Sequence, residues 1–110
     1  MNETTKNIFI KEMDSVFPHV EALPIDDPIL QEVSAVTDPG NLRAIFSNMK
    51  FFLETGTVPS SPAGQSSLPA VIFGIPAFQY FLSKEFANKI SVEDVAEMSA
   101  EYLRLYEKRS

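Results

Sequence analysis

The sequence predicts an all-α fold, an irregular bundle of about five helices that forms a single domain over residues 1–110. Apolar residues recur at the three- and four-residue spacing of a helical face in several separate segments. Aspartate, serine and proline stand where helices begin. Hydrophobic residues make up 45% of the chain and charged residues 22%, a balance that offsets chain entropy by burying one core.

The first predicted helix covers residues 4–17. Its apolar residues follow one helical face: Phe9, Met13, Val16 and Phe17. Pro18 disfavours helical backbone at the residue before it, so we expect this helix to stop near Val16. Residues 18–24 are then expected to be irregular, and a short strand over residues 7–10 is the alternative for the start of the segment.

Two Asp-Pro pairs mark the next two helix starts. Asp27 precedes Pro28, and because an aspartate accepts from free backbone N–H groups and proline fits the first turn, a helix should begin here and end at about Thr37. Its apolar face is Ile29, Leu30, Val33 and Val36. Asp38 and Pro39 repeat this start signal for the third helix.

The third helix has the clearest pattern in the chain. One face carries Leu42, Ile45, Phe46, Met49, Phe52 and Leu53. Gly56 follows the last of these and fits a left-handed C-terminal cap. Phe51 lies off this face and is expected to make a second contact or to be exposed.

Residues 57–67 form a Pro/Ser/Gly-rich segment without charge, predicted to be a flexible connector or, alternatively, a binding loop. The apolar helix that follows, residues 68–86, should start at a serine cap, Ser66 or Ser67. Gly74 and Pro76 weaken its middle, so we expect a kink or two shorter helices. Residues 68–82 are too short and too interrupted to span a membrane, and no membrane association is predicted.

The last helix begins at Ser91. Ser91 and Asp94 have the spacing of a capping box, and Ile90 and Val95 that of a hydrophobic staple. The side predicted to be buried carries Val92, Val95, Met98, Tyr102, Leu105 and Tyr106.

Negative charge is concentrated in the first third of the chain. The net charge is −6, and no lysine or arginine lies between Lys11 and Arg43. Seven carboxylates fall in that interval: Glu12, Asp14, Glu21, Asp26, Asp27, Glu32 and Asp38. This segment would repel the phosphate backbone of nucleic acid and attract a basic protein.

Groups that carry catalysis or bind metal ions are scarce. The chain has no cysteine and one histidine, His19, which is expected to be a surface or cap residue. The segment 64–68 resembles the start of a nucleophile elbow but ends in Leu68 instead of glycine. The adjacent Asp26 and Asp27 are explained by capping. We therefore predict no catalytic residue, no metal site and no cofactor.

The predicted location is the cytoplasm. The absence of cysteine favours a reducing compartment. Residues 1–10 lack the basic start and the apolar core of a secretory signal.

These features favour a small acidic module that docks on a basic protein and neutralises or regulates it, as immunity proteins, antitoxins and anti-factors do. The carboxylates predicted to contact the partner are Glu12, Asp14, Glu21, Asp26, Asp27 and Glu32. Phe51 and Tyr80 are predicted to be exposed aromatic anchors, because each departs from the face that its neighbours define. The alternative is a small-molecule or lipid carrier using the apolar segment 68–82. An enzyme subunit and a self-associating structural protein are further alternatives, and the oligomeric state is not predicted.

Overall fold

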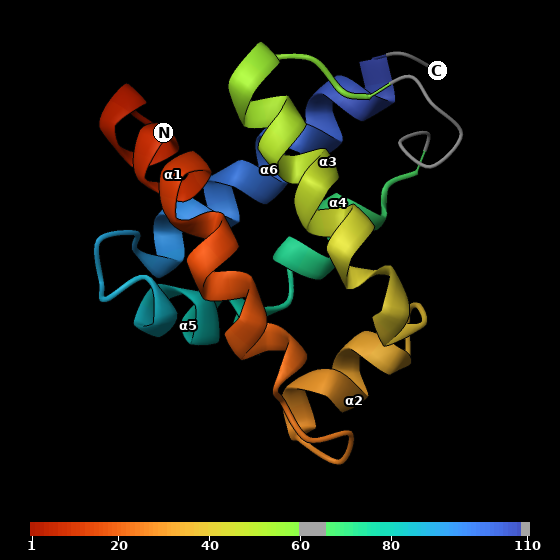
Figure 1. The fold of residues 1–110 in the computed structure, drawn as a ribbon. Helices are drawn as coiled ribbons and strands as arrows, with labels where there is room; N and C mark the ends of the chain where they lie inside the picture. The colour runs from red at the N-terminus through yellow and green to blue at the C-terminus, as the bar shows by residue number, and fades with distance from the viewer. Residues whose placement is uncertain (60–65, 109–110) are drawn as a thin grey trace.

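A computed structural model describes residues 1–59 and 66–108 of the chain. These residues form six α-helices and one 3-10 helix, without a strand. In chain order the elements are α1 (Glu3–Glu21), α2 (Pro28–Ser34), η1 (Pro39–Asn41), α3 (Leu42–Thr55), α4 (Leu68–Phe73), α5 (Pro76–Glu85) and α6 (Val92–Lys108) (Figure 1). The predicted all-α bundle is confirmed, with six helices because the segment 68–86 forms two.

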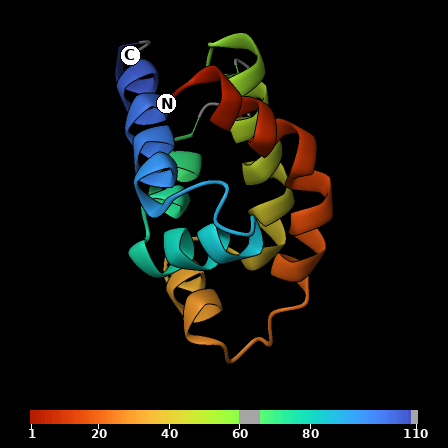
Figure 2. The ribbon, with the colours of Figure 1, turned by 90° about the vertical axis from the view of Figure 1, so that its left-hand side faces the viewer.

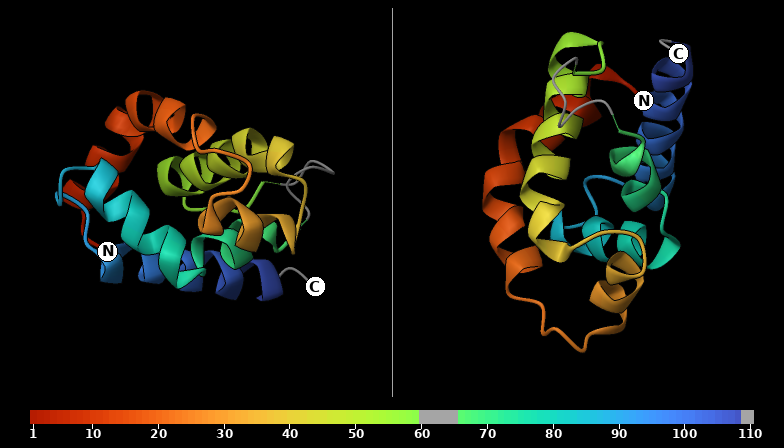
Figure 3. Two further views of the ribbon diagram at one scale, coloured as in Figure 1. Left: turned by 90° about the horizontal axis from the view of Figure 1, so that it is seen from below. Right: turned by 90° about the vertical axis from the view of Figure 1, so that its right-hand side faces the viewer.

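The helices surround one core. α1 and α3 run side by side in opposite directions, and α4 packs between α3 and α6 (Figures 1 and 3). α2 and the loop that leads to it form one end of the molecule, opposite the start of α1 and the end of α6 (Figure 2). The radius of gyration is 12.9 Å, against about 13 Å expected for a compact chain of this length.

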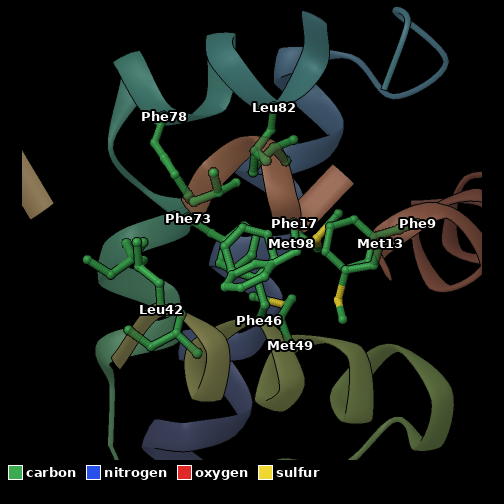
Figure 4. Close-up of a cluster of buried hydrophobic side chains, with 14 of the residues drawn as sticks. Phe9, Met13, Phe17, Leu42, Phe46, Met49, Phe73, Phe78, Leu82 and Met98 are labelled. Carbon is green, nitrogen blue, oxygen red and sulfur yellow. The ribbon is translucent and has the colours of Figure 1, made fainter. Parts of the chain in front are cut away.

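Phenylalanine rings from four helices meet in the centre of this core (Figure 4). The Phe46 centroid lies 5.1 Å from those of Phe17 and Phe73 and 5.9 Å from that of Phe78. Each such pair contributes about 0.5–1.5 kcal/mol beyond the burial of its area. Phe46 therefore fixes α3 against α1, α4 and α5 at once.

The predicted end of the first helix is wrong, because α1 continues through Pro18 to Glu21. Pro18 faces solvent, while Phe17 and Val20 are 6% and 1% exposed. A proline inside a helix costs about 3 kcal/mol, and burying a large apolar side chain returns about 1.5–3 kcal/mol. Two buried side chains outweigh the proline, so residues 18–21 are helical. Residues 7–10 are helical too, which excludes the alternative strand.

The Asp27-Pro28 start signal is confirmed for α2. The second signal starts the 3-10 helix η1 instead, and α3 begins after it at Leu42, without a side-chain cap bond from Asn41. The Asp27 carboxylate accepts the Ile29 N–H at 2.8 Å, and the Asp38 carboxylate accepts the Gly40 N–H at 2.7 Å. α2 ends at Ser34 instead of Thr37. Val36 is 44% exposed and contributes little to the core. The apolar face of this short helix therefore ends at Val33.

The pattern of the third helix is confirmed in full. The six residues predicted to share its buried face are all 6% exposed or less. Gly56 ends the helix with a φ of +73°, the left-handed conformation that favours glycine. Phe51 is 43% exposed, as its position off that face predicted.

The predicted interruption of the apolar segment occurs at Gly74, where α4 ends and α5 soon begins. A side chain on Gly74 would place its Cβ 2.9 Å from the Ala70 carbonyl oxygen and 3.2 Å from Ser99 Oγ. Glycine therefore lets α4 approach α6 closely. Ser66 Oγ accepts the Leu68 N–H at 3.0 Å, whereas Ser67, the N-cap residue of α4, makes no side-chain cap bond. Residues 60–65 of the predicted flexible loop lie outside the described residues.

The start of α6 has the predicted signature. Ser91 Oγ accepts the Asp94 N–H at 3.1 Å, and the Asp94 carboxylate accepts the Ser91 N–H at 3.0 Å. Ile90 and Val95, the two residues of the staple, are both fully buried. Within residues 1–59 and 66–108, no helix has the length and apolar character required to cross a membrane.

Candidate functional site

Half of the predicted partner-binding carboxylates form ion pairs within the fold. Glu12 lies 3.2 Å from Lys89 Nζ, and Asp14 lies 3.9 Å from Lys50 Nζ. Glu21 Oε1 accepts a hydrogen bond of 2.9 Å from an Arg43 NH₂ group. Bases from later in the chain thus offset the charge of these three residues on α1.

The other carboxylates gather around α2. We call Asp26, Asp27, Glu32 and Asp38 the acidic end. None of the four forms an ion pair with a described residue. Asp27 and Asp38 cap α2 and η1 by accepting hydrogen bonds from backbone N–H groups, and these bonds bring no basic side chain to either carboxylate. The carboxylates around α2 therefore lie together, without an ion pair, on the element that forms one end of the molecule (Figure 2). Other described carboxylates without an ion pair, such as Glu54 and Glu107, are spread over α3 and α6.

An apolar side chain projects from this end. Ile25 is 85% exposed, the most of any large apolar side chain among the described residues. It lies between Pro24 and Asp26 in the loop from α1 to α2. A single exposed apolar residue is ordinary, but one followed directly by two carboxylates, Asp26 and Asp27, matches the mixture of apolar contact and polar rim found in protein interfaces. Ile25 was not among the residues predicted to bind a partner, although its place in a Pro-Ile-Asp-Asp-Pro run, outside any helix pattern, was a usable signal.

A cleft of about 330 Å³ opens beside the acidic end, between α1, α2 and the start of α3. Apolar side chains line it, namely Phe17, Val20, Leu30 and Leu42, and Glu21 and Arg43 form part of its rim. A second hollow of about 240 Å³ shares Phe17, Glu21 and Arg43 with the first and reaches Asp14 and Ser47. The Glu21–Arg43 ion pair therefore lies where the two hollows meet.

The two predicted aromatic anchors are exposed but lie elsewhere. Phe51 belongs to the C-terminal half of α3, far along that helix from α2 (Figure 1). Tyr80 is 64% exposed on α5, where Lys84 Nζ lies 5.9 Å from its ring centroid. Neither ring stands on α1, on α2 or in the loop between them, where the six predicted carboxylates lie.

His19 links α1 to α5. Its Nδ1 lies 2.5 Å from a Glu85 carboxylate oxygen, and its side chain is 59% exposed. No group of three or more His, Cys, Asp or Glu side chains in the described part of the chain could hold a metal ion.

The segment suggested for a small-ligand carrier is largely core. Ile72, Phe73, Phe78 and Leu82 are fully buried among other helices. Leu68 and Pro69 line a hollow of about 210 Å³ against α3. The larger cleft is instead built by α1, α2 and α3.

Comparison with protein-family models, with curated proteins and with solved structures gave no match. The function is therefore inferred from the residues and their geometry alone.

Proposed function

We propose that the protein is a binding module that docks through its acidic end on a basic surface of another protein, and that it blocks or regulates that protein. This is the mode of action of immunity proteins, antitoxins and anti-factors. One observation carries the proposal: the fold pairs the carboxylates of α1 with bases and leaves those around α2 without one.

This uneven distribution of charge favours binding for a physical reason. Like charges held close together repel each other, so the negative charge of the acidic end does not stabilise the fold beyond the caps that Asp27 and Asp38 provide. The same charges attract a basic surface over a distance of about 10 Å at 0.1 M salt and speed the encounter. Ile25 then supplies an apolar contact inside the charged rim. The cytoplasm, a reducing compartment, suits a chain without cysteine.

A pull-down with charge-matched variants tests the proposal. D26K/E32K reverses two carboxylates of the acidic end, and E54K/E107K makes the same change in net charge at exposed positions on α3 and α6. At about 50 mM salt, wild type and E54K/E107K should retain the same basic protein, and about 500 mM salt should release it. D26K/E32K should fail to retain it.

Equal retention by D26K/E32K and wild type would show that the acidic end is not the docking surface. Circular dichroism of all three proteins controls for folding, because every substituted side chain is exposed and no change in helix content is expected.

A further inference from the structure

The strongest further feature is an arginine held on an aromatic ring at the junction of the two hollows. The Arg43 guanidinium carbon lies 4.7 Å from the centroid of the Phe17 ring, while the same guanidinium donates to Glu21. A ring face and a carboxylate are the two groups that together recognise a guanidinium.

The ring is fixed in place. Phe17 is 6% exposed, and its ring packs edge-on against Phe46 with 5.1 Å between centroids (Figure 4). Because Phe46 is itself buried among further rings, the face that Arg43 covers cannot turn away. We call Phe17 and Glu21 the arginine seat.

Arg43, by contrast, is held loosely. Its side chain is 71% exposed, and that of Glu21 is 51% exposed. The bond to Glu21 is the single hydrogen bond of its side chain among the described residues. An exposed ion pair of this kind contributes little, so another guanidinium can replace it.

A second carboxylate lies near the seat. Asp14 lines the second hollow with a side chain that is 82% exposed, and its ion pair with Lys50 is long, at 3.9 Å. Its backbone carbonyl also loses the usual helical donor four residues on, because Pro18 has no N–H. An incoming cationic side chain with several N–H groups would find partners here.

We propose that the arginine seat receives an arginine side chain of the basic partner, and that Arg43 occupies the seat until the partner displaces it. The inference rests on the proposed function and names the partner's contact group. Lysine is a poorer occupant, because its compact ammonium cannot lie flat on the ring and bond the carboxylate through a planar fork.

Binding of fluorescein-labelled octa-arginine and octa-lysine, measured by anisotropy, tests the seat directly. R43A empties the seat, and R104A removes the same charge from an exposed position on α6. R43A should bind octa-arginine about two- to fivefold more tightly than R104A does, the factor that corresponds to one exposed cation–π contact. Octa-lysine should bind the two variants about equally.

E21Q should weaken octa-arginine binding more than E54Q, its charge-matched control on α3. In NMR spectra of the wild-type protein, octa-arginine should shift the amide signals of Glu21 and Arg43. This readout reports on the seat itself and not on overall charge.

Equal affinities of R43A and R104A for octa-arginine would contradict the proposal that the seat binds arginine. An absence of octa-arginine binding would contradict it too. The proposed function fails differently: the peptides would then bind D26K/E32K as tightly as wild type. The proposal for the seat would still hold in that case if R43A binds octa-arginine more tightly than R104A does.

Discussion

The break between α4 and α5 leaves backbone carbonyl groups without the N–H donors of a continuous helix. Single side chains donate hydrogen bonds to these carbonyl groups instead. The buried Gln79 amide donates to the Phe73 carbonyl at 2.7 Å, and Ser99 Oγ donates to the Ala70 carbonyl at 2.7 Å. Pro76 and Gly74 signalled the break in the sequence. The side chains that donate to the freed carbonyl groups could not be predicted in this way. Ser99 is distant in sequence, and Gln79 is a polar residue within an apolar run.

Removing the Gln79 amide should therefore destabilise the fold. Gln79→Ala leaves the Phe73 carbonyl buried without this donor, and the free energy of unfolding should fall by about 1–3 kcal/mol. Urea denaturation measures it. Gln31→Ala, at an exposed position on α2, should change it by less than about 0.5 kcal/mol. Equal effects of the two substitutions would show that the Gln79 bond contributes nothing.

At the scale of elements, caps and apolar spacing predicted the helix starts because both are set by residues close in sequence. The start of α6 and the buried face of α3 are examples. The end of α1 was missed because the cost of Pro18 is local, whereas the burial of Val20 depends on α2 and α3. A prediction based only on residues adjacent in sequence therefore ends α1 too early.

Pro18→Ala should stabilise α1 if burial holds the helix together in spite of the proline. Alanine restores an N–H for the Asp14 carbonyl, and the free energy of unfolding should rise by about 1–3 kcal/mol. Thermal and urea unfolding measure this. Ser15→Ala, one exposed turn earlier, should gain about 0.5 kcal/mol or less. A destabilised Pro18→Ala protein would mean that α1 needs the bend that proline introduces.

At the scale of the whole molecule, the fold decides which charges are available. The sequence showed seven carboxylates in one run, but Lys89 pairs with Glu12 across 77 residues and Arg43 with Glu21 across 22. Such pairing is invisible in a sequence until the helices are placed. The acidic surface that we propose for binding is therefore smaller than the first third of the chain. It comprises the region around α2 and includes Ile25.

Docking through the acidic end is best tested by the association rate of the basic protein that the pull-down retains, measured by stopped flow as a function of salt. If the acidic end attracts the partner, D26K/E32K should slow association about tenfold or more at low salt and flatten the salt dependence, whereas E54K/E107K should change both much less. Equal rates and equal salt slopes for the two variants would contradict docking through the acidic end.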